Sequence, residues 1–456
     1  MSEAAAVPTA EDELLELAGK VAAEARGTEQ VEAFATSSTS TSVRVHGGDI
    51  ESLTRATTAG IGVRVVQDGR QGFAYAGSLD PAVVADVLAE ARDNARYAQP
   101  EGWVGLATPD GVAPADIDLW RDGAVALPTS RKVEMALALE RAVGACDRRI
   151  VGVRVAQWAD GAGAGAVATS TGIAVTGRST GCHLAVQALA RDGDETTTGD
   201  GVSVGREPGD LDVDAAAEEA AVRTTRLLGA RQPASGTVTL VLEPRMAATL
   251  VSVVAGTLDG ESVLKGRSPF ADRVGQQIAS PLLTLVDDPT DPRSLGADRH
   301  DGEGLATRRV RLVEGGVLQG FLHNTATGRR AGVPSTASAV RSYRSTPGVG
   351  AQALAVAPGR SSLEELVAGV DHGVLVQSMS GLHSGINPVS GDFSVGVEGL
   401  MVRAGATAEP VREATVASTL QRLLLDVVAV GRDVEWTPGG TGAVALVIPG
   451  VTLSGA

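Results

Sequence analysis

The sequence contains few cysteines and few aromatic residues. Only Cys146 and Cys182 occur among 456 residues, and Phe, Trp and Tyr together make up 3% of the chain. Two cysteines are too few for a disulfide framework or for a structural zinc site built from thiolates. We expect both to be buried thiols in a reducing compartment, and we expect the core to consist of Val, Leu and Ala.

An excess of positive charge is also missing. The formal net charge is −16, whereas proteins that bind nucleic acid usually carry a basic balance or a basic stripe that contacts phosphates. The composition therefore argues against a nucleic-acid partner.

Long apolar runs are absent from the sequence. No uncharged apolar run reaches the ~18 residues of a membrane-spanning helix, and the nearest, 237–258, is interrupted by Glu243, Pro244 and Arg245. The first residues lack the basic stretch followed by an apolar run that is typical of a signal peptide. We expect a soluble cytoplasmic protein that does not contact membranes.

The length of the chain predicts at least two domains, because single cores rarely exceed ~250–300 residues. We predict an α+β fold. Residues 1–229 would form an N-terminal α/β domain of a sheet with helices, 230–236 a linker, and 237–456 a β-rich C-terminal domain. The linker prediction rests on the Gln-Pro-Ala-Ser-Gly sequence, which is typical of loops.

Hydrophobic periodicity predicts most of the regular elements. The helices are expected at 11–26, 81–97, 128–146 (capped by Thr129 or Ser130), 213–228, 244–258 and 411–430. A hairpin is expected to turn at Asp68-Gly69, a pair that favours tight turns. Three segments are expected to lie outside strands: the glycine-rich 161–165 and 177–181 as turns, and the acidic 192–212 as an exposed loop.

The sequence offers few candidates for catalysis. None of the six histidines is followed by Glu, so the two-histidine helix motif of zinc hydrolases is missing and we expect no metal site built from this chain alone. Ser179 lies in a G-x-S-x-G pattern, but the strand-like sequence after it favours a turn serine over a nucleophile. The pair Asp287-Asp288 is expected in a solvated loop. Clustered arginines could steer an acidic ligand, although solvated edges are their usual role; they are Arg308, Arg309, Arg311, Arg329 and Arg330.

A glycine-rich polar segment at 378–399 is the strongest candidate for a site. Five glycines and Asn387-Pro388 fix its backbone, and polar side chains stand between them. Either this is a structural turn whose polar groups satisfy its own backbone, or it faces a peptide or other ligand. The candidate lining residues are His383, Ser384, Gly385, Asn387, Gly391, Asp392 and Phe393.

The segment 384–394 resembles the glycine segment of the TldD/PmbA (modulator of DNA gyrase) family. Further similar motifs follow the family's order and spacing, and the similarity extends over essentially the whole chain, more diffusely in the N-terminal half. These motifs are the D-x-E-G sequence at 301–304, the hairpin ending at 315–322, the helix at 325–332 and the Val-Gly segment at 430–434.

The resemblance is closest to the TldE (PmbA-like) branch of that family. TldD-like members carry H-E-x-x-x-H on a helix early in the second domain and a cysteine near the C-terminus, which together hold zinc. Residue counting places the two histidines at Val251 and Gly256 and the glutamate at Ser252, and no cysteine follows Cys182. None of these side chains can bind zinc or act as the general base.

The resemblance implies a non-catalytic subunit that pairs with a TldD-like zinc peptidase in a cytoplasmic heterodimer. The complex would cleave or trim peptides, or amide bonds in a natural-product pathway, with zinc in the partner and none in this chain. Without its partner, this chain could form a homodimer. Helix 244–258 and loop 381–394 would face the partner or the substrate tunnel. Two alternatives are an amide hydrolase with a divergent site around His383 and Asp392, and a peptide-binding regulatory protein.

Overall fold

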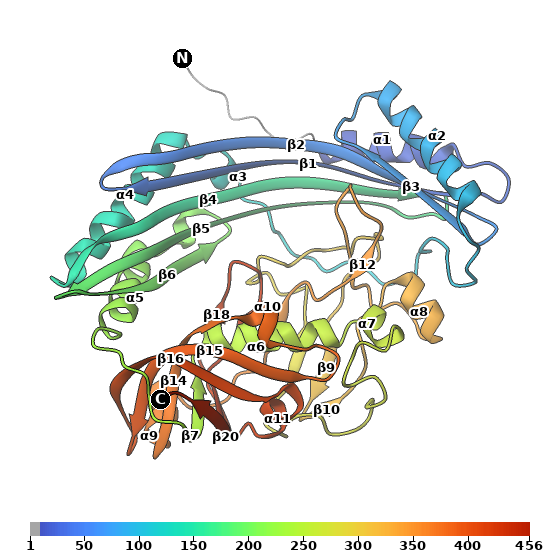
Figure 1. The fold of residues 1–456 in the computed structure, drawn as a ribbon. Helices are drawn as coiled ribbons and strands as arrows, with labels where there is room; N and C mark the ends of the chain where they lie inside the picture. The colour runs from blue at the N-terminus through green and yellow to red at the C-terminus, as the bar shows by residue number, and fades with distance from the viewer. Residues whose placement is uncertain (1–9) are drawn as a thin grey trace.

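The computed structural model describes residues 10–456, and within them the strands form three six-stranded sheets and one two-stranded sheet (Figure 1). The predicted α+β fold is confirmed. A long, curved sheet from the N-terminal half arches over the body formed by the C-terminal half. No helix among residues 10–456 is both long and apolar enough to cross a membrane.

The N-terminal sheet is antiparallel and has the order β3-β2-β1-β4-β5-β6. Its strands are β1 (Gln30–His46), β2 (Asp49–Gln67), β3 (Arg70–Ala76), β4 (Ile150–Thr169), β5 (Ala174–Asp192) and β6 (Glu195–Gly205). Helices pack on its outer face; in the chain, the short α3 (Asp122–Val125) precedes α4 and η1 (Pro208–Asp210) precedes α5. The packed helices are α1 (Glu11–Ala23), α2 (Pro81–Tyr97), α4 (Thr129–Cys146) and α5 (Val213–Thr225).

Two hydrophobic clusters fix these helices on the sheet. One joins α1 and α2 to β1–β4 and the other joins α4 and α5 to the far half of the sheet. Alternation along β4 separates the two faces, since Ala162, Ala164 and Ala166 are buried on the helix side. The intervening Gly163 and Gly165 are therefore left on the inner face, toward the C-terminal half.

Two further six-stranded sheets build the C-terminal half. In one, the additional pairing of β16 with β20 closes five strands into a ring. Its strands are β7 (Gly236–Leu242), β14 (His372–Ser380), β15 (Asp392–Arg403), β16 (Ala406–Thr419), β20 (Leu446–Ser454) and, at its edge, β17 (Ala429–Val430). The other contains β8 (Leu285–Asp287), β9 (Val310–Glu314), β10 (Val317–Leu318), β13 (Leu354–Val356), β18 (Glu435–Trp436) and β19 (Gly442–Ala443).

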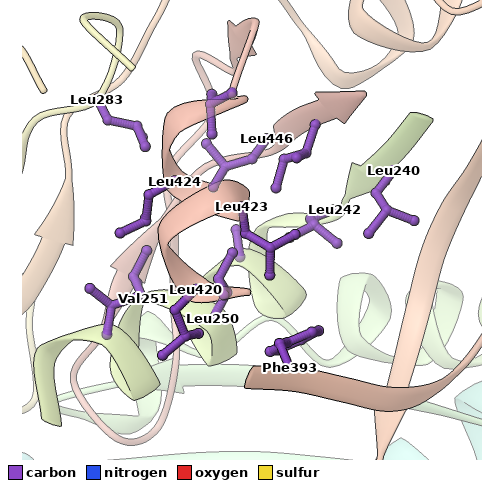
Figure 2. Packing of buried hydrophobic residues seen from close by; sticks show 14 of the residues in the cluster. Leu240, Leu242, Leu250, Val251, Leu283, Phe393, Leu420, Leu423, Leu424 and Leu446 are labelled. Carbon is purple, nitrogen blue, oxygen red and sulfur yellow. The ribbon is translucent and has the colours of Figure 1, made fainter. Parts of the chain in front are cut away.

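Helix α6 (Pro244–Thr257) lies between the two halves and contributes to the largest core (Figure 2). In that core, Leu250 and Val251 pack with Leu420 and Leu423 of α11 (Leu420–Leu425) and with Phe393. The remaining elements are α7 (Gly260–Leu264), α8 (Thr325–Ala331), α9 (Leu363–Ala368), α10 (Leu382–Gly385) and the pair β11 (Ala339–Val340) and β12 (Gly348–Val349).

The predicted interruptions of the long strands are wrong. Residues 161–165 lie inside β4, 177–181 lie inside β5, and most of 192–212 forms β6. Glycine is a poor strand former in isolation, but strands on both sides pair with β4 and β5 and hold their backbones extended. In β6, a Cβ on Gly201 would come 1.9 Å from the Ala216 carbonyl oxygen. Glycine at this position therefore permits α5 to pack closely against the strand.

The helix predicted at 411–430 is also wrong. Residues up to Thr419 belong to β16, which pairs with both β15 and β20, and only Leu420–Leu425 are helical. The apolar residues of this segment fit a helical spacing by coincidence, because strand and helix contribute to one core in succession.

Three local predictions also need correction. Pro128 occupies the N-cap position of α4, and neither Thr129 nor Ser130 caps it. Cys146 is exposed, whereas Cys182 is buried as expected. Asp287 is fully buried instead of solvated, and its Oδ1 accepts hydrogen bonds from the Gln352 and Ala353 amides.

Several predicted elements are confirmed. Helix α2 begins with Pro81 and is capped by Asp80, whose carboxylate accepts from the Ala82 amide. The β2–β3 hairpin turns at Asp68 and Gly69, both with positive φ, as the Asp-Gly pair indicates. The division into domains at 230–236 stays a prediction; limited proteolysis that cuts first within these residues would support it.

Candidate functional site

The inner face of the N-terminal sheet, opposite its helices, lines a row of three cavities. The first has a volume of about 280 Å³ and is lined by β1, β4 and β5 together with Asp298, His300 and Asp301. The second, of about 440 Å³, shares Ser38, Gly163 and Ser179 with the first and is therefore next to it. On the sheet side, the walls of these two cavities consist largely of glycine, alanine, serine and threonine.

The third cavity extends the row toward helix α6. It has a volume of about 460 Å³ and is lined by β4, β5 and β6 on one side and by Arg245, Met246 and Thr249 of α6 on the other. We call the space along these three cavities the chamber. It lies between the sheet and the C-terminal body and is open to solvent.

Helix α6 also lines a fourth cavity, of about 220 Å³, with Ser252, Ala255 and Gly256, and Asp259 beyond the helix end adds to its wall. The Ser252 hydroxyl lies 3.4 Å from that of Thr441 on its far wall. Val251 points the other way and is 2% exposed within the hydrophobic core (Figure 2). Of the three positions identified with the family's zinc motif, two therefore face a cavity and one packs in the core.

The residues around this cavity do not fit a zinc ion. Zinc in proteins takes three or four ligands from Cys, His, Asp or Glu, whereas Asp259 is the one such side chain on the cavity wall. Asp259 already caps α7, where its Oδ1 accepts from the Ser262 amide. Within residues 10–456, no group of three or more His, Cys, Asp or Glu side chains is arranged to hold a metal ion.

The glycine-rich segment uses most of its polar groups internally. Asn387 Oδ1 accepts from the Val389 and Ser390 amides, and the Ser390 hydroxyl donates to Asp392 Oδ2 at 2.6 Å. His383 and Ser384, on α10, are exposed. The contacts of Asn387 and Asp392 favour a structural turn at that end of the loop, while His383 and Ser384 remain accessible to a ligand.

Three other residues of the segment have structural roles. Phe393 is 3% exposed and belongs to the main core (Figure 2). Gly391 has a φ of 85°, a conformation that favours glycine. A Cβ on Gly385 would lie 1.9 Å from the Ser394 carbonyl oxygen, so this position needs glycine for close backbone approach. None of the seven candidate residues lines the four cavities above, and their contact with a peptide stays a prediction.

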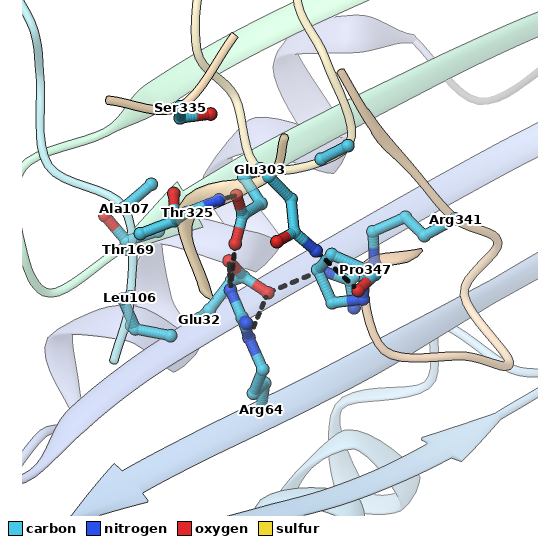
Figure 3. A network of polar contacts seen from close by, with 12 residues as sticks. Glu32, Arg64, Leu106, Ala107, Thr169, Glu303, Thr325, Ser335, Arg341 and Pro347 are labelled. Carbon is cyan, nitrogen blue, oxygen red and sulfur yellow. Dashed lines mark hydrogen bonds and ion pairs between the residues drawn. The ribbon is translucent and has the colours of Figure 1, made fainter. Parts of the chain in front are cut away.

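A buried network of charges joins the N-terminal sheet to the C-terminal half beside the chamber (Figure 3). Arg64 of β2 binds Glu32 of β1 at 2.7 Å and Glu303 at 3.2 Å, and Arg341 also pairs with Glu32. Glu303 Oε2 accepts from the Thr325 amide at 2.8 Å. The side chains of the four charged residues are at most 3% exposed, so each depends on the others for its interactions.

Sequence reasoning missed this network, although two signals for it are present. Glu32 interrupts an apolar stretch between Val31 and Ala33, and Glu303 belongs to the D-x-E-G motif. Neither signal identifies the partner, because 239 residues separate Arg64 from Glu303 along the chain. The structure shows that this motif serves the contact between the two halves.

Asp301 of the same motif is buried and accepts three backbone hydrogen bonds. Its Oδ1 accepts from the Glu303 and Leu305 amides and its Oδ2 from the Ala339 amide. Burial, and secondarily the charge of Glu303, raise the pKa of Asp301 to about 7. The folded protein therefore favours the protonated form of this side chain at mildly acidic pH.

This raised pKa predicts a pH-dependent contribution to stability. Since the folded-state pKa lies above the unfolded value, Asp301 stabilises the fold at low pH and loses that contribution as the pH rises through about 7. Between about pH 5.5 and pH 8 the loss should be about 2 kcal/mol. Asp301→Asn should remove this part of the pH dependence of the unfolding free energy, measured by denaturant titration. Asp433→Asn, at an exposed position, should retain it; equal profiles for Asp301→Asn and the unmodified protein would contradict the assignment.

Three models of one family match successive parts of the chain. They describe the PmbA/TldA metallopeptidase domain 1 at residues 31–95, the central domain at 124–228 and the C-terminal domain at 235–455. Metalloprotease PmbA of Escherichia coli O157:H7 is 26% identical over 402 residues, covering 87% of this chain and 86% of that protein. The PmbA homolog of Haemophilus influenzae is 26% identical over 424 residues, with 92% and 90% covered.

Solved structures are similar over nearly the whole chain. A protein described as a modulator of a DNA gyrase from Thermotoga maritima superposes with a TM-score of 0.87 at 26% identity, covering 97% of this chain and 99% of that one. TldE from Thermococcus kodakarensis superposes with a TM-score of 0.88 over the same shares at 22% identity, which supports the fold alone.

Proposed function

The chain belongs to the PmbA/TldD metallopeptidase family, and from this premise we propose that it is a TldE-type, non-catalytic subunit of a zinc peptidase complex. The complex would contain a TldD-like partner, act in the cytoplasm, and cleave or trim peptides or related amide bonds. In this proposal the partner supplies the zinc and the general base.

Helix α6 is the observation that carries the proposal. Zinc hydrolysis needs a metal that lowers the pKa of bound water and a base that moves its proton. In this chain, the positions counted as the zinc-binding histidines of TldD-like members are Val251 and Gly256, and that of the glutamate base is Ser252. Val251 is packed in the core. Neither valine nor glycine has a side-chain lone pair for a metal, and serine is a poor general base, so the reaction would need groups from another chain.

The chamber suggests what this subunit contributes. Its inner wall includes the extended strands β4 and β5, in which Gly163, Gly177 and Gly181 carry no side chain. Holding a peptide in one orientation supplies part of the catalytic advantage without any reacting group. Helix α6 and the loop 381–394 would face the partner or the peptide.

A reconstitution experiment tests the proposal. The chain is purified alone and with a TldD-like partner, and bound zinc and cleavage of an unfolded peptide are measured for each sample and for the partner alone. We expect no stoichiometric zinc and no cleavage from the chain alone, and faster cleavage by the mixture than by the partner. Zinc and activity in the lone chain would overturn the proposal, as would a mixture that neither co-elutes nor exceeds the partner's activity.

A further inference from the structure

The two sides of the first chamber cavity differ in charge. On the sheet side, β1, β4 and β5 contribute uncharged residues and the single charged residue Arg178. On the opposite side, the C-terminal half contributes Asp298, His300 and Asp301. A Cβ on Gly177 would lie 3.3 Å from Asp298 Oδ1, so the Asp298 carboxylate approaches the inner face of β5.

Asp298 is the carboxylate of this cavity that a ligand can reach. Asp298 is exposed, whereas Asp301 is 4% exposed and its oxygens accept hydrogen bonds from three backbone amides. Asp298 Oδ1 accepts from the His300 amide at 3.2 Å. Within residues 10–456, no Lys or Arg side chain forms an ion pair with Asp298.

Two arginines close enough to influence Asp298 are engaged elsewhere. Arg206 is 6% exposed and donates to three backbone carbonyls, and Arg299 Nε donates to the Ala115 carbonyl. Burial raises the pKa of Asp298 although both guanidinium groups and two backbone amides favour its charged form. The carboxylate is therefore incompletely compensated, and a bound cation would stabilise its charge.

Most other ionised groups on the chamber wall form ion pairs with residues that do not line it. These pairs are Arg178 with Glu11, Asp160 with Lys132, and Arg245 with Glu219. Asp200, in the third cavity, has no ion pair among the described residues and accepts a hydrogen bond from Gln187. Burial lowers the pKa of His183 and of His300, so both imidazoles favour the neutral form at neutral pH. The chamber therefore retains negative charge at Asp298 and at Asp200.

From this arrangement we infer that the chamber binds a positively charged group of its peptide, and that Asp298 is the residue that selects this group. An ammonium group offers three hydrogen-bond donors and no acceptor. It would pair with the Asp298 carboxylate, and the Ser179 hydroxyl, two residues from Gly177 on the same face of β5, offers a further acceptor nearby. The ammonium would come from a lysine side chain or from the N-terminus of the peptide. This inference rests on the proposed function in taking a peptide as the ligand, and it adds the chemical class of that peptide.

Calorimetric titration of the full chain, without partner or zinc, tests the selection. Four peptides share one uncharged sequence of Gly, Ser, Ala and Gln. One has both ends blocked, one adds a central Lys, one adds a central Glu, and one has a free N-terminus instead. All are compared at constant, low ionic strength, where charges are least screened.

We expect the Lys peptide, the peptide with the free N-terminus, or both to bind about tenfold more tightly than the blocked neutral peptide. The Glu peptide should bind more weakly than the neutral one. The Lys and N-terminus arms distinguish the two sources of the ammonium group. Equal affinities across the series, or no saturable binding of any peptide, would overturn the inference.

A matched pair of variants assigns the selection to one carboxylate. Asp298→Asn keeps the side-chain size and the acceptor for the His300 amide but removes the charge, so it should abolish the preference for the cationic peptide. Asp200→Asn removes the same charge from the third cavity and should retain the preference. A preference that survives Asp298→Asn would overturn the assignment, and the peptide series on the unmodified protein tests the selection whatever the stability of the variant.

The outcome is separable from that of the reconstitution experiment. Selective binding by the lone chain together with a failed reconstitution would overturn the proposed subunit role alone. A successful reconstitution together with equal affinities across the peptide series would overturn the role of Asp298 alone.

Discussion

Replacing Glu32 with alanine is expected to lower the free energy of unfolding by about 3–5 kcal/mol. The Glu32 side chain is fully buried and accepts hydrogen bonds from Arg64 at 3.0 Å and 2.7 Å. Among the described residues it is also the hydrogen-bonding partner of Arg341, whose side chain is fully buried too. Of the ion pairs that the structure gives these two buried guanidinium groups, the substitution would leave the one between Arg64 and Glu303.

Denaturant titration of a matched pair of variants measures this effect. Glu409→Ala removes the carboxylate of the Arg403–Glu409 ion pair, whose side chains are 53% and 51% exposed, and should cost less than about 1 kcal/mol. A Glu32→Ala protein no less stable than Glu409→Ala would show that solvent or local rearrangement compensates the buried charges. Replacing Glu32, Arg64, Glu303 and Arg341 together with apolar residues should recover part of the loss, since the cost arises from unpaired charges.

Leu423→Ala is expected to destabilise the protein by about 2–5 kcal/mol. Leu423 is 2% exposed and packs in the core that joins α11 to α6 and to the ring of strands (Figure 2). Truncation would remove apolar contacts and leave a cavity that the surrounding strands can fill only in part.

Leu425→Ala on the same helix provides the control. Leu425 is 43% exposed, so its truncation removes little buried surface and should change the unfolding free energy by less than about 1 kcal/mol. Both variants carry the same chemical change on one helix, and helix propensity therefore cancels in the comparison. Equal losses would mean that α11 does not pack as the structure shows.

The sequence was sufficient for elements whose signals are local. Asp80 and Pro81 mark the start of α2, and Asp68-Gly69 marks the β2–β3 turn, because capping and positive φ depend on a few adjacent residues. The sequence failed where pairing with distant strands overrides propensity. The glycines at 161–165 lie in the middle of a twenty-residue strand because β1 and β5 hold both of its edges.

In the candidate site, too, the sequence predicted the features that depend on single residues, and distant contacts decided the rest. Residue types alone indicated that Val251, Ser252 and Gly256 cannot hold zinc, since this depends on atoms that each side chain lacks. The directions of these side chains, with Val251 in the core and the others beside a cavity, were decided by the packing of α6. The strands that wall the chamber could not be foreseen, because they come together with loops far apart in the chain.

By itself, the sequence determined the mixed fold class, the five long helices α1, α2, α4, α5 and α6, and the absence of zinc-binding side chains on α6, since these follow from periodicity and side-chain chemistry. Tertiary structure alone decided the long strands, the chamber and the bonding of Glu303 to Arg64. It also placed Asp298 against Gly177 on the inner face of β5. Such features require groups separated by many residues to meet, and local sequence does not specify which distant group each one contacts.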